Sequence, residues 1–173
     1  DHSYEKGCLI LHQLRNTVGD DAFFASIKLY LEKNAFKSVE IHNLRLAFEE
    51  TTGEDLNWFF NQWFFKKGHP VLDVDYKVQS DSLLITIKQT QNLKESPVYR
   101  LPLALDVYEG GKATRHEIVV DKQKQELLFT VSSAVDFITL DANNIMCGEI
   151  HQKLNADQAY LKYSTAKLYR DKI

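Results

Sequence analysis

The chain has 173 residues, of which 44% are hydrophobic and 26% charged, and its formal net charge at pH 7 is -3. These values are typical of a globular protein with a real core, built as one ordinary domain or two small ones. The Lys and Arg residues form no basic stripe and no apolar run reaches the roughly 18 residues of a membrane span, so we expect neither a nucleic-acid partner nor a membrane span in this chain.

Residues 4–67 carry apolar side chains at helical spacing and predict four helices joined by short connections. Gly19 ends the first helix, and the pair Asp20-Asp21 can cap the second. Gly53 ends the third helix and Gly68 follows the fourth. The expected apolar faces are Cys8, Leu11, Leu14 and Val18; Phe23, Phe24, Ile27, Tyr30 and Leu31; Ile41, Leu44, Ala47 and Phe48; and Leu56, Phe59, Phe60, Trp63 and Phe64.

At residue 71 the apolar period changes from about 3.6 residues to two, which predicts strands. The expected strands lie near residues 72–78, 83–87, 101–107, 116–120, 127–131 and 135–140. Gly110-Gly111 offers a two-residue hairpin turn between the third and fourth of them. Six or so short strands at this spacing predict an antiparallel sandwich, and the chain as a whole is predicted to be of the α+β class.

The final stretch is predicted to be helical again. Asn155 and Gln158 form a capping-box pattern, and Leu161, Thr165 and Leu168 share one face. Two interpretations stay open for this helix, namely the first helix of a further domain and a terminal helix that docks on the sandwich. From the changes of period we expect the boundaries between domains to lie after residues 68 and 151.

Tyr4, in the segment Tyr4-Glu5-Lys6-Gly7, is the candidate catalytic residue. A phenol is protonated at neutral pH, so it can donate a hydrogen bond to a developing oxyanion, and a fixed donor of this kind is a large contribution to acyl-transfer catalysis. Composition alone favours the interpretation of Tyr4 as an ordinary half-buried aromatic residue. Gly7 costs a helix roughly 1 kcal/mol relative to Ala, which predicts a close approach of another backbone. Lys6 is expected to be solvated.

The sequence contains no complete active site. None of the six histidines has the His-Glu-x-x-His spacing of a zinc peptidase; His116-Glu117 begins it, but a strand follows. Gly-x-Ser-x-Gly and glycine-rich phosphate loops are missing, and Cys8 and Cys147 stand far apart. We expect no metal or cofactor site in this chain. The adjacent acidic pairs, Asp20-Asp21 and Glu49-Glu50, are interpreted as a cap and a solvated face.

Taken together, several segments resemble the zinc aminopeptidases of the aminopeptidase N (alanyl aminopeptidase) and leukotriene A4 hydrolase family. The segments that carry the resemblance are Tyr4-Glu5-Lys6-Gly7, Val18-Gly19-Asp20-Asp21-Ala22-Phe23-Phe24, the run from Gly53 to Trp63, and Gly68-His69-Pro70-Val71-Leu72. Their order and spacing match over residues 4–78. The resemblance implies that residues 1–68 are the second, helical half of a thermolysin-like catalytic domain. Residues 69–151 would be the following β-sandwich, and residues 152–173 the first helix of a C-terminal helical domain.

The catalytic tyrosine of that family corresponds to Tyr4 in this sequence. The resemblance implies that its hydroxyl group hydrogen-bonds the scissile carbonyl oxygen, opposite a zinc ion. The zinc-binding helix, the third zinc ligand and the loop that binds the free amine of the peptide all precede this tyrosine, so none lies in this chain. The resemblance therefore implies a zinc-dependent aminopeptidase as the parent protein, with a peptide as substrate and the remaining domains of the same polypeptide as partners. The chain alone is expected to be inactive.

Two rival interpretations remain from the sequence. A non-catalytic relative could use the same architecture as a binding or scaffold module. Alternatively, the sandwich could be an independent adhesion-type domain, which predicts that residues 70–151 fold alone. The surface left open on the helical part also predicts that this part either associates with itself or packs loosely.

Overall fold

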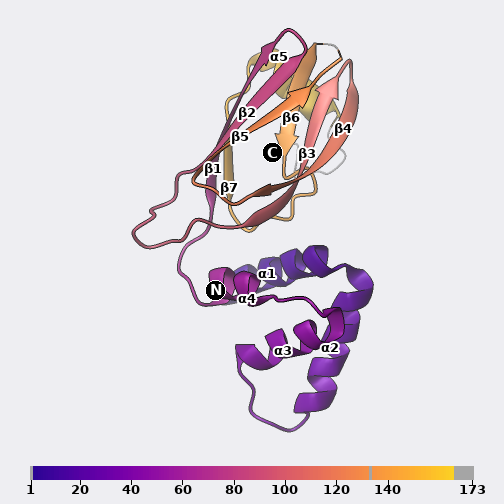
Figure 1. The fold of residues 1–173 in the computed structure, drawn as a ribbon, viewed down its shortest axis with the longest axis vertical. Coiled ribbons are helices and arrows are strands. Elements are labelled where there is room, and N and C mark those ends of the chain that lie inside the picture. Colours follow the sequence, from indigo (N-terminus) through magenta and orange to yellow (C-terminus); the bar gives the residue numbers. More distant parts are fainter. Residues whose placement is uncertain (1, 133, 166–173) are drawn as a thin grey trace.

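The computed structural model describes residues 2–132 and 134–165. Its helices and strands are α1 (His2–Val18), α2 (Asp20–Asn34), α3 (Ile41–Thr52), α4 (Asn57–Phe64), β1 (Val71–Gln79), β2 (Ser82–Gln89), β3 (Leu101–Glu109), β4 (Lys112–Val120), β5 (Lys124–Thr130), β6 (Val135–Leu140), β7 (Glu149–Gln152) and α5 (Ala156–Thr165). Four helices precede the strands, and α1 and α4 lie nearest to the sandwich (Figure 1). The predicted α+β class is confirmed.

The buried side of α1 agrees with the predicted one in part, since Leu14 is buried and Val18 packs against the core. Ile10, Gln13 and Leu14 are buried, whereas Cys8 is exposed. These buried residues recur at three or four positions, as a helix packed on one side requires. The period was thus predicted correctly, but the buried stripe is rotated toward Gln13, whose polar side chain gave no apolar signal.

The predicted cap of α2 is wrong. Gly19 is the N-cap residue, with φ 83°, and no side chain caps this helix. Asp20 lies inside the first turn, where its carboxylate accepts two hydrogen bonds from Arg15, at 2.8 and 2.6 Å. A positive φ is cheap only for glycine, so the tight turn between α1 and α2 takes Gly19 at the cap position and moves Asp20 into the helix.

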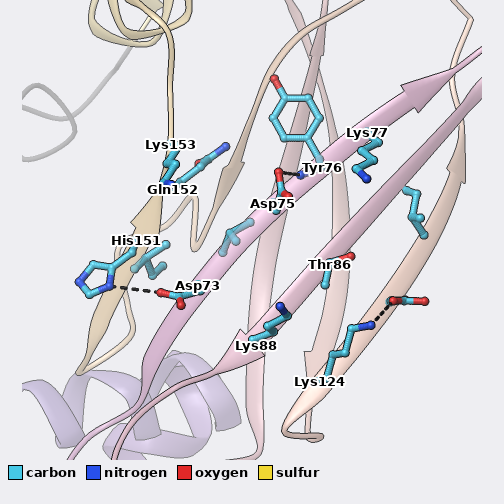
Figure 2. A pocket seen from close by; sticks show the side chains of 14 residues that line it. Asp73, Asp75, Tyr76, Lys77, Thr86, Lys88, Lys124, His151, Gln152 and Lys153 are labelled. Atoms are coloured by element: carbon cyan, nitrogen blue, oxygen red, sulfur yellow. Dashed lines mark hydrogen bonds and ion pairs between the residues drawn. The ribbon is translucent and has the colours of Figure 1, made fainter.

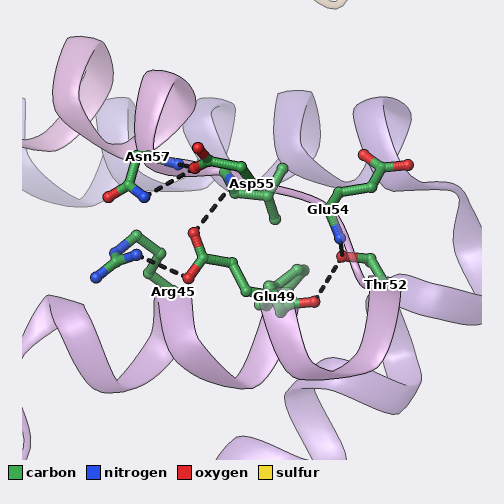
Figure 3. A network of polar contacts seen from close by, with 8 residues as sticks. Arg45, Glu49, Thr52, Glu54, Asp55 and Asn57 are labelled. Carbon is green, nitrogen blue, oxygen red and sulfur yellow. Dashed lines mark hydrogen bonds and ion pairs between the residues drawn. The ribbon is translucent and has the colours of Figure 1, made fainter.

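A polar network joins α3 to the start of α4 (Figure 3). The Glu49 carboxylate accepts hydrogen bonds from Arg45 Nη1 at 2.7 Å and from the Leu56 backbone N–H at 3.1 Å. Asp55 Oδ1 accepts one from the Asn57 backbone N–H at 2.8 Å. The first N–H groups of a helix lack intrahelical partners, and here the two carboxylates accept hydrogen bonds from them. Glu49 is therefore a bridging residue with only 20% of its side chain exposed, and its predicted place on a solvated face is wrong.

The aromatic stripe of α4 is core, as predicted. Leu56, Phe59, Phe60 and Trp63 are each at most 2% exposed. The Trp63 ring packs on that of Tyr99, with centroids 5.0 Å apart, and so connects the helices to the sandwich. One hydrophobic cluster continues from α1 and α4 into both sheets.

The strands form two sheets, with the orders β5-β2-β1-β7 and β4-β3-β6. Gly110 and Gly111, at φ 55° and 75°, make the predicted two-residue turn between β3 and β4. The strand β7 was missed, because Glu149–Gln152 spans only four residues and contains one apolar side chain. It pairs with β1 in parallel, from Val71 with Glu149 to Val74 with Gln152, whereas the other pairs are antiparallel.

The predicted capping box of α5 is confirmed. Asn155 Oδ1 accepts a hydrogen bond from the Gln158 N–H at 2.9 Å, and Gln158 Oε1 accepts one from the Asn155 N–H at 3.1 Å. Gln158 Nε2 also donates to Tyr76 Oη at 2.6 Å, which attaches α5 to the sandwich. Leu168 lies outside the described residues. The divisions after residues 68 and 151, and the assignment of α5 to a further domain, stay predictions.

Candidate functional site

Tyr4 lies in the first turn of α1, which begins at His2. Its side chain is 81% exposed, so it is not the half-buried aromatic that composition favours. Among the described residues no hydrogen bond engages its hydroxyl group. The phenol therefore projects freely from a regular helix, in a position where it could meet a ligand or another part of a protein.

The predicted close approach at Gly7 is wrong. A Cβ atom built on Gly7 meets no heavy atom of another residue within 4 Å. Nothing in the described structure requires glycine at this position.

Lys6 is not merely solvated, which corrects the expectation from the sequence. Its Nζ atom donates a hydrogen bond to the backbone carbonyl oxygen of Gly68, at 2.9 Å. Because the two residues are 62 positions apart, this bond links the first helix to the connection between α4 and β1. The motif lysine therefore has a tertiary contact that no local pattern could predict.

A cleft of about 330 Å³ adjoins this contact. Glu5, Lys6 and Leu9 of α1 line one side, and the other side is lined by His69, Cys147, Gly148 and Glu149. Burial raises the pKa of the Cys147 thiol, and the nearby Lys6 charge opposes this only in part. A thiol with a raised pKa is a poor nucleophile, so Cys147 serves the packing of the cleft.

Titratable side chains form a row beside the cleft, along β7 and the start of β1. His69 Nε2 lies 2.9 Å from Glu149 Oε1, His151 Nε2 lies 3.4 Å from Glu149 Oε2, and His151 Nδ1 lies 3.3 Å from Asp73 Oδ1. The hydrogen bond from His69, aided by the charges of both histidines, holds the pKa of Glu149 below its usual value. Over residues 2–132 and 134–165, no group of three His, Cys, Asp or Glu side chains could hold a metal ion.

A larger concavity, of about 950 Å³, lies on the outer face of the four-stranded sheet (Figure 2). Asp73, Asp75 and Lys77 of β1 line it together with Lys88 of β2 and Lys124 of β5. Asp73, Asp75 and Lys77 are exposed, as the alternation of side chains along β1 requires. It contains charges of both signs and none of the site residues predicted from the sequence.

Comparison with known proteins shows what the chain is similar to. Residues 1–63 match the family described as the Peptidase family M1 domain. The chain is 29% identical to a probable aminopeptidase 1 of Sulfurisphaera tokodaii over 141 residues, which are 82% of this chain and 17% of that relative. It is 34% identical to an aminopeptidase N of Lactococcus lactis subsp. lactis over 86 residues, which are 50% of this chain and 10% of that relative. These similarities relate the chain to the M1 peptidase family, whose domain matches its helical part.

The fold of this chain recurs in a solved structure. The aminopeptidase A of Legionella pneumophila, solved in complex with aspartic acid, superposes with a TM-score of 0.79 at 16% identity. The similarity covers 94% of this chain and 19% of that one, so it includes both the helices and the sandwich. The chain spans less than a fifth of the length of each of these relatives.

Two of the sequence segments that carry the M1 resemblance lie in contact. Lys6 belongs to Tyr4-Glu5-Lys6-Gly7, and its hydrogen-bond acceptor belongs to Gly68-His69-Pro70. Tyr4 itself stands clear of this contact. No helix in the described part of the chain is both long and apolar enough to cross a membrane.

Proposed function

We propose that this chain is part of an aminopeptidase that removes N-terminal residues from peptides, and that the Tyr4 hydroxyl stabilises the transition state. The hydroxyl would donate a hydrogen bond to the scissile carbonyl oxygen while that oxygen gains negative charge. Such a donor contributes most when it is fixed before the reaction, because no reorganisation is then needed. The substrate class rests on the aminopeptidase relatives, and the role of Tyr4 rests on its motif.

The exposure of Tyr4 is the observation that supports its role best. Aromatic side chains that are 81% exposed on a well-formed helix are not core residues, and the described structure gives this one no partner. A catalytic group must in contrast remain accessible to its substrate. The free hydroxyl is thus available to an acceptor outside this chain.

The described residues do not fit a zinc ion, since they contain no suitable group of three ligands. We therefore assign the zinc of the proposed enzyme to other residues of a longer protein, and we derive no step through it. For this chain the proposal concerns the placement of one hydrogen-bond donor.

The test is Tyr4→Phe in the longer protein that carries this segment, assayed with a panel of aminoacyl anilides. We expect kcat to fall by roughly 10²–10³, as when one oxyanion donor is lost, with KM and metal content almost unchanged. Tyr160→Phe is the matched control, because this tyrosine of α5 is 72% exposed. A Tyr4→Phe enzyme with near-normal kcat would refute the role of Tyr4. A wild-type protein that binds peptides without hydrolysing them would support the scaffold alternative.

A further inference from the structure

Lys6 and Tyr4 point to opposite sides of α1. Successive residues of an α-helix are about 100° apart, so two residues at i and i+2 differ by about 200° around the axis. The exposed fraction of Tyr4 and the contact of Lys6 with Gly68 agree with this geometry. Lys6 therefore attaches the first turn of α1 to the connection between α4 and β1, on the side of the helix opposite Tyr4.

The acceptor of Lys6 lies in a connection that packs against the segment between β2 and β3. Gly68 has φ 84°, and a Cβ atom there would lie 1.9 Å from Ser96 Oγ, so the backbone is held against that side chain. The preceding carbonyl group, of Lys67, accepts a hydrogen bond from the buried Tyr99 hydroxyl at 3.2 Å. Lys6 thus binds to a connection that itself contacts Ser96 and Tyr99.

A second contact lies two helical turns further along α1. Gln13, which is 7% exposed, accepts a hydrogen bond from the Cys147 backbone N–H at 2.7 Å. Seven residues correspond to about 700°, so Lys6 and Gln13 share one side of the helix. Two contacts on one side fix both the rotation of α1 about its axis and its distance from the sandwich.

We propose that Lys6 is a positioning residue, which holds the first turn of α1 so that the Tyr4 hydroxyl reaches the reacting carbonyl oxygen. This inference rests on the proposed function of Tyr4. The first turn of a helix lacks part of its hydrogen bonds and frays readily. Displacement of a catalytic group by about 1 Å can lower a rate by about 10²-fold, so a tether at this turn has a large effect on turnover.

The experiment compares Lys6→Met with Lys6→Arg in the longer protein. Lys6→Met removes the donor, and we expect kcat to fall about tenfold while KM changes little, because placement of the donor matters most in the transition state. The Arg variant keeps a charged donor of similar reach and should recover most of kcat. Lys28→Met is the matched control, since Lys28 is 75% exposed on α2. Exchange of the backbone amide hydrogens of residues 4–8 should become faster in Lys6→Met but not in Lys6→Arg or Lys28→Met.

A double-mutant cycle separates positioning from general stabilisation. If Lys6 acts through Tyr4, then Lys6→Met should have no further effect on kcat in the Tyr4→Phe background. Equal losses in both backgrounds would overturn the positioning role, as would an unchanged kcat in the single variant. Either outcome leaves the proposed function intact as long as Tyr4→Phe lowers kcat. A normal kcat in Tyr4→Phe would instead remove the proposed function itself.

Discussion

The side chain of Gln62 pairs with the backbone of Arg100 as a neighbouring strand would. Its Nε2 atom donates to the Arg100 carbonyl oxygen at 2.9 Å, and its Oε1 atom accepts from the Arg100 N–H at 2.9 Å. Gln62 lies in α4 and is 8% exposed, while Arg100 directly precedes β3. One amide group thus satisfies both polar groups of a backbone unit where the helices meet the sandwich.

Replacement of Gln62 by Met should destabilise the fold. Met keeps a similar volume but leaves the Arg100 N–H and carbonyl group without these partners, and each unsatisfied group costs about 1–3 kcal/mol. We expect the free energy of unfolding to fall by about 2 kcal/mol, because the site is only partly shielded from water. Urea denaturation of the 173-residue chain measures this value.

The control for Gln62 is Gln79→Met, because Gln79 is exposed at the end of β1. Surface substitutions of this kind change stability by less than about 0.5 kcal/mol. Equal effects at the two positions would show that the Gln62 hydrogen bonds contribute nothing to stability.

Gly68→Ala should be more costly than Gly53→Ala. Both glycines have positive φ, at 84° and 72°, so alanine introduces a backbone strain of roughly 1–2 kcal/mol at either one. At Gly53 the new methyl group meets no atom within 4 Å, whereas at Gly68 it collides with the buried Ser96. We expect the Gly68 variant to lose at least about 1 kcal/mol more, as overpacking does.

The double variant Gly68→Ala with Ser96→Gly identifies the source of the difference. Removal of the Ser96 side chain relieves the collision but leaves the backbone strain. The loss of stability from Ser96→Gly to the double variant should therefore approach the loss caused by Gly53→Ala in the wild type. Thermal unfolding of the four variants gives these values. If Ser96→Gly brings no relief, the collision is not the cause.

Glu149→Gln should flatten the dependence of stability on pH. The pKa of Glu149 in the folded state is lowered, chiefly by the hydrogen bond from His69. Its stabilisation is therefore present above the usual carboxyl pKa and is lost as the pH falls through the lowered value. Denaturant midpoints should decrease less steeply between about pH 5 and pH 3 in this variant than in the wild type.

The matched control for Glu149 is Glu95→Gln, an exposed glutamate in the β2–β3 connection. This variant should retain the steepness of the wild type. A Glu149→Gln curve parallel to that of the wild type over the whole range would contradict the pairing with His69.

Local patterns were sufficient for most of the elements. The periods of 3.6 and two predicted four helices and six strands, and the Asn155–Gln158 box was found because capping depends on neighbours along the chain. β7 was missed, since a short polar strand is specified by its partner β1 and not by its own alternation. The close packing of Gly68 likewise depends on Ser96, which no spacing rule associates with it.

By itself the sequence determined the order of the helices and of the strands other than β7, the resemblance to M1 aminopeptidases and the candidate Tyr4, because these follow from local spacing and short motifs. Only the tertiary structure decided what surrounds the motif. It showed Tyr4 exposed, Gly7 unpacked and Lys6 bound to Gly68. Contacts between residues 62 positions apart depend on how the chain folds back on itself, which local periodicity does not encode.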